Sequence, residues 1–149
     1  MYQFAREPLS PAYEEAGDLL RAHWEELAAF KDIPLDPDID AYRAMEKADM
    51  LRVFTVRCEG KLIGYAVYMV RKNPHYKSTK MACSDIVLVE KAHRSMGLGN
   101  GLFDFVEASL KAEGVVVIET RSKADHPVLG MLLESRGHVL IDVSHQKRL

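Results

Sequence analysis

A glycine-rich stretch between an apolar run and a helical pattern is the part of the chain best suited to hold an anion. The stretch is Arg94-Ser95-Met96-Gly97-Leu98-Gly99-Asn100-Gly101. A β-branched run at 86–89 precedes it, and a helical pattern follows it to about residue 113. The order of strand, glycine loop and helix presents free backbone N–H groups and a positive helix end to a ligand. The loop therefore predicts a phosphate-bearing ligand; the alternative is a glycine-rich turn that binds nothing.

Three residues ahead of this loop have the chemistry for proton transfer. Asp85 precedes the apolar run by one position, so in a regular strand it shares a face with Val87 and Val89. His75 and Tyr76 lie in a polar loop at 71–80, where we expect the mouth of an acceptor cleft. Carboxylate, imidazole and phenol groups serve as general bases and acids. The alternatives are an Asp85 that only caps the strand or pairs with a lysine, and an exposed His-Tyr pair without function.

Two common nucleotide-binding motifs are excluded on specific residues. The dinucleotide fingerprint G-x-G-x-x-G needs a third glycine where the chain has Leu102. The Walker loop needs Gly-Lys followed by Ser or Thr, and the sequence contains no such tripeptide. The pattern that does fit is R-x-x-G-x-G, formed by Arg94, Gly97 and Gly99.

Composition predicts one ordinary globular domain over residues 1–149. The chain is 48% hydrophobic and 28% charged, with a net charge of −2. These values give no general positive field for nucleic acid, although a local basic patch lies at 71–80. Without an 18-residue apolar stretch or a signal-peptide pattern, we expect a cytoplasmic protein, intact from Met1, with no membrane partner. Cys58 and Cys83 are expected to be free thiols, and the spacing of the histidines predicts no metal site.

The order of the expected strands and helices predicts a mixed α/β fold with helices on both faces of the sheet. Alternation, helical spacing, and Pro and Gly punctuation predict the order β-α-α-β-β-β-α-β-α-β. The expected strands are 2–7, 51–58, 62–70, 81–89, 115–120 and 139–143, and the expected helices are 10–30, 36–47, the one that follows the glycine loop, and 125–136.

The motif at Arg94, Gly97 and Gly99 resembles the coenzyme A signature of the GCN5-related N-acetyltransferase (GNAT) superfamily. In that family a strand reading roughly L-x-V precedes the signature, and Val87-Leu88-Val89 stands at that distance. The element order is also similar over nearly the whole chain. The resemblance implies the GNAT acyl-CoA N-acyltransferase fold, with acetyl-CoA as co-substrate. It also implies direct transfer of the acetyl group, in a ternary complex, to the primary amine of a small molecule or peptide, and it is compatible with a homodimer.

The same resemblance implies roles for individual residues. Coenzyme contacts would come from Val87, Leu88 and Val89 for the pantetheine arm, from Arg94, Ser95, Met96, Gly97, Leu98, Gly99, Asn100 and Gly101 for the pyrophosphate, and from His126, which replaces an asparagine common in the family. Asp85 would be the general base, while His75 and Tyr76 would transfer a proton or hold the acceptor. His23-Trp24-Glu25-Glu26 and the basic C-terminus add a narrower similarity to small GNAT-like proteins of tailed phages.

One departure from the family pattern concerns the general acid. Many GNAT enzymes carry a tyrosine in the last helix that protonates the departing thiolate, and the matching position here is Leu133. Water, Tyr76, His126 or Ser135 would then serve, or the thiolate would leave unassisted. A catalytically weak or inactive protein that binds acyl-CoA, or a phage structural protein with this fold, is the alternative. No motif specifies the acceptor.

Overall fold

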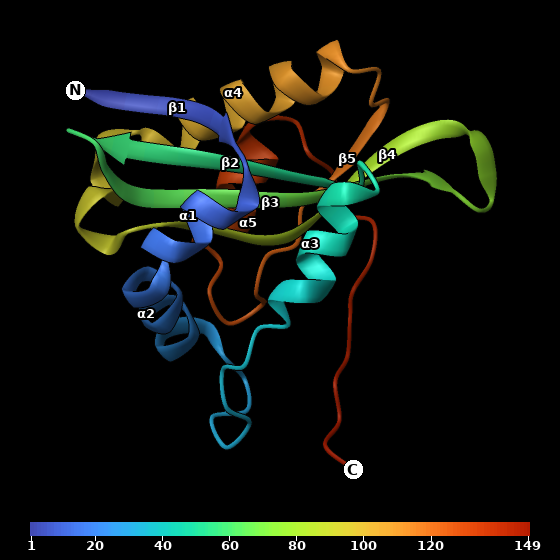
Figure 1. Ribbon diagram of the computed structural model, residues 1–149. Helices are drawn as coiled ribbons and strands as arrows, with labels where there is room; N and C mark the ends of the chain where they lie inside the picture. Colours follow the sequence, from blue (N-terminus) through green and yellow to red (C-terminus); the bar gives the residue numbers. More distant parts are fainter.

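The computed structural model describes residues 1–149 except for the side chains of Ser95 and Met96. Its centre is a mixed sheet of five strands in the order β1-β2-β3-β4-β5 (Figure 1). The strands are β1 (Tyr2–Glu7), β2 (Leu51–Cys58), β3 (Lys61–Asn73), β4 (Tyr76–Val89) and β5 (Val117–Glu119). Neighbours from β1 to β4 are antiparallel, and β5 joins β4 in parallel. The predicted mixed α/β fold is confirmed.

Helices cover both faces of this sheet. They are α1 (Leu9–Glu15), α2 (Gly17–Leu27), α3 (Ile39–Lys47), the 3-10 helix η1 (Lys91–Met96), α4 (Leu98–Ala112) and α5 (Val128–Ser135). In Figure 1, α1, α2 and α3 lie on one side of the sheet and α4 lies on the other. None of the helices in the described part of the chain is long and apolar enough to span a membrane.

Alternation along the strands divides the core into two layers. On β2, Phe54 and Val56 pack with Leu102 and other residues of α4. Val53, one position away, faces the opposite layer with Leu9 of α1. Because successive side chains of a strand point to opposite faces, one β-branched run supplies both layers. Both faces of the central strands are therefore buried.

Three boundaries differ from those predicted. The helix expected at 10–30 is two helices that break at Ala16, beside Gly17, a residue with low helix propensity. The expected helix at 36–47 begins at Ile39, where the Asp38 carboxylate accepts the Ala41 N–H at 2.9 Å. The polar loop expected at 71–80 is instead the end of the β3–β4 hairpin, which projects beyond the sheet (Figure 1).

The strand expected at 139–143 is also wrong, because the described residues form no strand after β5. Val139, Leu140, Ile141 and Val143 are exposed in an extended segment that runs past α3 (Figure 1). High β-propensity makes a strand only where a partner edge is available to pair with it. In this structure β5 is short and pairs only with β4. Residues 139–143 therefore have the sequence pattern of a strand but no neighbouring strand with which to pair.

Candidate active site

The parallel pairing of β5 with β4 is short, and the two strands then separate. The two strands pair only between Met81–Cys83 and Val117–Glu119. Beyond Cys83, β4 pairs in the described structure only with β3, along its other edge. One edge of residues 84–89 is thus open along most of its length, and such an edge pairs readily with an extended ligand. Arg94 Nε donates to the Val89 carbonyl at 2.8 Å and closes the end of this edge.

The start of α4 lies directly after this edge and η1. Gly97 precedes the helix with a positive φ of 70°, and the first turn contains no side-chain cap and no acidic residue. The N–H of Gly101 already reaches the Gly97 carbonyl, at 3.3 Å. The N–H groups of the three preceding residues have no carbonyl within the helix to bind. Together with the helix dipole, they form a place for an anion.

Two glycines of the loop also have a packing role that the sequence did not reveal. A Cβ on Gly99 would lie 2.8 Å from Leu132 Cδ2 in α5, and one on Gly101 would lie 2.7 Å from Phe4 Cζ in β1. Both neighbours are the outer ends of apolar side chains, which would have to shift, so glycine at these positions also favours close packing of α4 on α5 and β1. The glycine pattern alone therefore does not distinguish a ligand site from tight packing. The predicted contacts of Ser95 and Met96 fall on side chains outside the described residues.

Arg94 is held in an ion pair rather than directed into open space. Its guanidinium donates to both carboxylate oxygens of Glu26 in α2, at 2.6 and 2.8 Å. The hydrogen bonds from Arg94 lower the pKa of Glu26, so both groups stay charged at neutral pH. Arg94 thereby connects α2 with the end of β4. His126 precedes α5 and is half-exposed, 3.9 Å from Asp125. The coenzyme contacts of Arg94 and His126 stay predictions.

Asp85 lies at an irregularity in β4. Val67 of β3 pairs with Ile86 and Tyr68 pairs with Ser84, so Asp85 is one extra residue in the ladder, a β-bulge. The bulge shifts the alternation of side chains by one position. Asp85 therefore faces the α1–α3 side with Ile86, and the expectation that it shares the face of Val87 and Val89 is wrong.

Tyr42 of α3 fixes the Asp85 carboxylate. The Tyr42 hydroxyl donates to Asp85 Oδ2 at 2.6 Å. Burial raises the pKa of Tyr42, and the hydrogen bond to Asp85 adds to this effect, so the phenol keeps its proton. Because the two residues are 43 positions apart, no local motif could have predicted the pair. The hydrogen bond to Tyr42 uses one carboxylate oxygen, and among the described residues no side chain bonds to the other.

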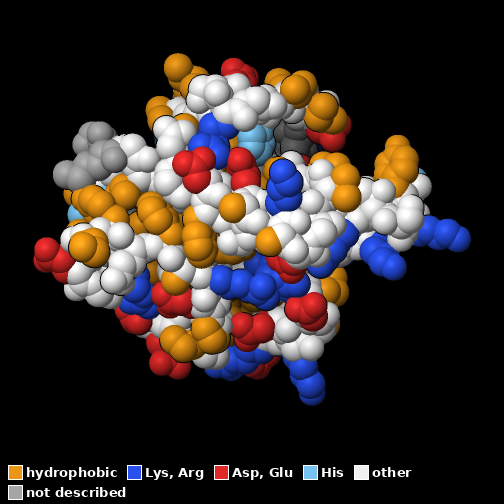
Figure 2. All heavy atoms as spheres, turned by 90° about the horizontal axis from the view of Figure 1, so that it is seen from above, with side chains coloured by type: hydrophobic (Ala, Val, Ile, Leu, Met, Phe, Trp, Pro, Cys, Tyr) orange, Lys and Arg blue, Asp and Glu red, His pale blue; other side chains and the backbone are white. Residues whose placement is uncertain are grey.

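His75 and Tyr76 lie far from this carboxylate. They are at the tip of the β3–β4 hairpin, where Tyr76 is 65% exposed. Nine residues of extended strand, roughly 30 Å at ~3.3 Å per residue, separate Tyr76 from Asp85. Figure 2 shows the hairpin as a projection that carries Lys and Arg side chains. Their expected place at the mouth of a cleft beside Asp85 is therefore wrong, and we assign them no proton transfer there.

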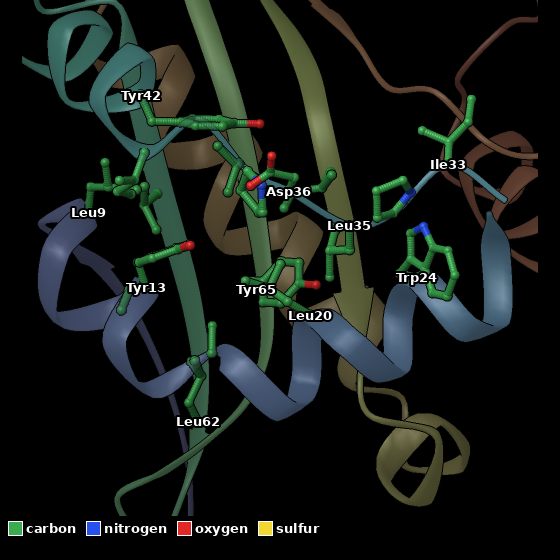
Figure 3. A pocket seen from close by; sticks show the side chains of 18 of the residues that line it. Leu9, Tyr13, Leu20, Trp24, Ile33, Leu35, Asp36, Tyr42, Leu62 and Tyr65 are labelled. Carbon is green, nitrogen blue, oxygen red and sulfur yellow. The ribbon is translucent and has the colours of Figure 1, made fainter. Parts of the chain in front are cut away.

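A cavity of about 400 Å³ lies between the sheet and the helices on the Asp85 side. Its lining comes from α1, α2, the segment between α2 and α3, and the faces of β2, β3 and β4. Figure 3 shows Tyr42, Tyr65, Trp24 and Leu35 around it. Asp85 itself does not line the cavity, but Tyr42, which does, donates to its carboxylate, so one hydrogen bond connects the cavity wall with Asp85.

A second hydrogen-bonded pair lies at the same cavity. The Tyr65 hydroxyl is 2.7 Å from Nδ1 of His23, which comes from α2. Burial lowers the pKa of His23, so its imidazole is mainly neutral at pH 7. From the sequence we gave His23, Tyr42 and Tyr65 no catalytic role. They become candidates in the structure, where Tyr42 and Tyr65 line one cavity and His23 is hydrogen-bonded to Tyr65.

The remaining reactive groups do not suit covalent catalysis. Burial, followed by the charge of Glu119, raises the pKa of the Cys83 thiol, whereas a nucleophilic cysteine needs a lowered pKa. Cys58 and Cys83 are both free, as predicted.

Leu133, at the position of the family tyrosine, is buried in the core. The Ser135 hydroxyl donates to the Leu132 carbonyl at 2.7 Å. Among the described residues no cluster has the composition of a metal site.

An open strand edge beside an uncapped helix start, on a sheet of this order, is the arrangement expected of the acyl-CoA N-acyltransferase fold. The sequence profile of the Acetyltransferase (GNAT) family matches residues 13–137, so the chain belongs to that family. The resemblance inferred from the sequence is confirmed at this level. A search of curated proteins finds no match to the chain.

Solved structures with the same fold carry several acetyltransferase activities. An aminoglycoside acetyltransferase, meta-AAC0020, from an uncultured soil metagenomic sample is 15% identical, with a TM-score of 0.79 over 99% of this chain and 95% of that one. Ribosomal-protein-alanine N-acetyltransferase from Brucella melitensis biovar Abortus 2308 is 17% identical, with a TM-score of 0.76 over 100% and 99%. Glucosamine-6-phosphate N-acetyltransferase from Arabidopsis thaliana is 14% identical, with a TM-score of 0.73 over 99% and 98%. At these identities the similarity shows the fold alone.

Proposed function

We propose that the protein is an N-acetyltransferase that moves the acetyl group of acetyl-CoA to a primary amine by direct attack in a ternary complex. The observation that carries this proposal is the open edge of β4 next to the uncapped start of α4. An extended pantetheine arm would pair with the edge at Val87–Val89, and the pyrophosphate would accept hydrogen bonds from the first turn of α4. Backbone groups, which are fixed by the fold, would thus hold the donor.

On the acceptor side, we assign the general base to Asp85. An alkylamine has a pKa near ~10.4 in water, so it must lose a proton before it attacks the thioester. Asp85 faces the cavity side of the sheet, while the open edge of its own strand belongs to the donor site. The acceptor amine would therefore meet the thioester beside this carboxylate. A backbone N–H of β4 would stabilise the oxyanion that forms on the thioester carbonyl.

A second candidate function is acyl-CoA binding without efficient catalysis. Leu133 supports it, because a buried leucine occupies the position from which many family members protonate the thiolate. The second candidate predicts the same coenzyme site but no turnover with any amine. Thiol release from acetyl-CoA, measured with a panel of amines, separates the two functions.

Asn100→Asp tests the coenzyme site, and we expect it to weaken acetyl-CoA binding about tenfold or more. Asn100 is exposed in the first turn of α4, and its Oδ1 accepts from Arg136 at 3.2 Å, which an aspartate preserves. A carboxylate near a helix N-terminus stabilises the helix by ~0.3–1 kcal/mol, so the variant folds. The same charge repels a pyrophosphate. Binding is measured by calorimetry and by the rise in melting temperature with ligand.

The matched control for this test is Asn73→Asp at the far end of the hairpin. The Asn73 Oδ1 accepts the His75 N–H at 2.8 Å, so this aspartate also keeps its local bond. The control adds the same charge and should bind acetyl-CoA like the wild type. Equal affinity in both variants would remove the pyrophosphate from the start of α4. No stabilisation of the wild type by millimolar acetyl-CoA would contradict both candidate functions.

A further inference from the structure

The cavity beside Asp85 is mostly apolar, and this limits the chemistry of what it can hold. Val67 and Ile86 of the sheet line it from one side, and Trp24 of α2 lines it from another. Ile33 and Leu35, from the segment between α2 and α3, complete the wall (Figure 3). Its volume of about 400 Å³ lies within the range of small-molecule sites, ~300–1,000 Å³. The cavity therefore fits a small ligand with an apolar body.

The polar side chains of the cavity are a minority of its lining and some are already engaged; they are Tyr13, Asp36, Tyr42, Tyr65, Lys123 and Gln146. The hydroxyls of Tyr42 and Tyr65 already bond to Asp85 and His23. A ligand hydroxyl that loses its hydrogen bonds to water and finds no partner in the cavity weakens binding. An amino sugar would bury several such hydroxyls at once. The lining thus disfavours polyhydroxylated acceptors, although solved structures with the same fold include aminoglycoside and amino-sugar acetyltransferases.

The charges at the cavity suit one amine and oppose a second. Asp36 lines the cavity, and Asp85 lies behind Tyr42, so two carboxylates attract an ammonium group. Lys123 also lines the cavity and would repel a second positive charge. Apolar surroundings lower the pKa of a bound ammonium group, which eases transfer of its proton to Asp85. A monoamine therefore suits the site better than a polyamine.

We infer that the acceptor is a primary monoamine on an apolar body, of the arylalkylamine class. This inference rests on the proposed function, because it takes the cavity as the acceptor site. The amine would lie toward Tyr42 and Asp85, and the apolar body would contact Trp24, Ile33 and Leu35. The polar end of the cavity would then contact the amine, and the apolar walls would contact the apolar body of the ligand.

The first test compares the turnover of three amines with acetyl-CoA. We expect kcat/KM for 2-phenylethylamine to exceed that for glucosamine or spermidine by about 100-fold or more. Buried hydroxyls of glucosamine would stay unpaired, and the additional charges of spermidine would meet apolar walls and Lys123. Comparable or better turnover of glucosamine would overturn the assignment of an apolar acceptor. Preference for spermidine would overturn the assignment of a monoamine.

The second test measures binding without catalysis. Trp24 is the only tryptophan of the chain and lines the cavity, so its fluorescence reports directly on occupancy. We expect a saturable change with 2-phenylethylamine, with and without coenzyme A, and none with glucosamine. Binding without turnover would support this inference while contradicting the proposed enzyme. If acetyl-CoA binds but 2-phenylethylamine changes neither fluorescence nor turnover, the inference is overturned.

A pair of matched variants locates the apolar contact. Leu35 is 43% exposed, so Leu35→Ser keeps the fold while it removes part of the cavity wall. We expect KM for 2-phenylethylamine to rise about three- to tenfold with kcat nearly unchanged, because the lost contact stabilises the bound substrate and the transition state equally. Leu140→Ser makes the same change at an exposed position and should leave KM unchanged. Equal KM in both variants, with an equal fluorescence response of Trp24, would place the ligand elsewhere.

Discussion

Asp85→Asn is expected to lower kcat about 100-fold or more while acetyl-CoA affinity changes by less than about twofold, because a positioned base contributes ~10²–10⁴. Asparagine keeps an oxygen that accepts the Tyr42 hydroxyl, which reaches Asp85 Oδ2 at 2.6 Å. The substitution therefore removes the charge but little of the shape. Steady-state kinetics with a saturating amine, and calorimetry with acetyl-CoA, measure the two quantities separately.

The control for this substitution is Asp142→Asn, which removes the same charge from an exposed position in the C-terminal segment. It should keep wild-type kcat. Equal losses of kcat and coenzyme affinity in Asp85→Asn would argue that the residue shapes β4 rather than accepts a proton. His23, hydrogen-bonded to Tyr65 at the same cavity, would then be the next candidate for the base.

Gly64→Ala is expected to destabilise the protein by about 1–3 kcal/mol, the usual effect of overpacking. Gly64 lies opposite Val89 in the β3–β4 ladder. A Cβ there would stand 2.8 Å from the Leu88 carbonyl oxygen and 3.2 Å from Val89 Cα. These are backbone atoms and cannot rotate away, so the strands must separate. Since Leu88 and Val89 belong to the proposed donor edge, acetyl-CoA affinity should fall with the melting temperature.

Gly17→Ala provides the matched control, because nothing lies within 4 Å of its added Cβ and the backbone there has no positive φ. Such a change usually stabilises a protein by ~0.4–1 kcal/mol, since the unfolded chain loses freedom. Thermal unfolding and acetyl-CoA calorimetry of the two variants give the comparison. A Gly64→Ala protein that melts and binds like the wild type would mean that β4 is not held tightly against β3 at this point.

The sequence predicted the elements that depend on local patterns. The hairpin, the glycine loop and its helix follow from periodicity and from Gly and Pro punctuation, and together they were sufficient for the family resemblance. Features that depend on a distant partner could not be predicted in this way. The face of Asp85 depends on how β4 pairs with β3, and the Tyr42 contact crosses 43 positions.

The two halves of the candidate site differ in how far local sequence patterns predict them. Its donor half is built from consecutive residues, so a motif describes it, although the structure pairs Arg94 with Glu26 and packs Gly99 against α5. The acceptor half combines α1, α2, α3 and three strands, and no motif contains it. His75 and Tyr76 were placed wrongly because a polar stretch with one proline looks like a loop, whereas the pairing of β3 with β4 extends almost to the turn.

The bulge in β4 also means that the pairing of this strand does not depend on Asp85. Without Asp85, Ser84 and Ile86 would be neighbours, and each half of β4 would keep its present partners in β3. The alternation of faces would then run through the strand without interruption, with the same apolar residues in both core layers. The sheet is thus complete without this residue. Deletion of Asp85 is therefore expected to give a regular strand that keeps both core layers and loses only this carboxylate.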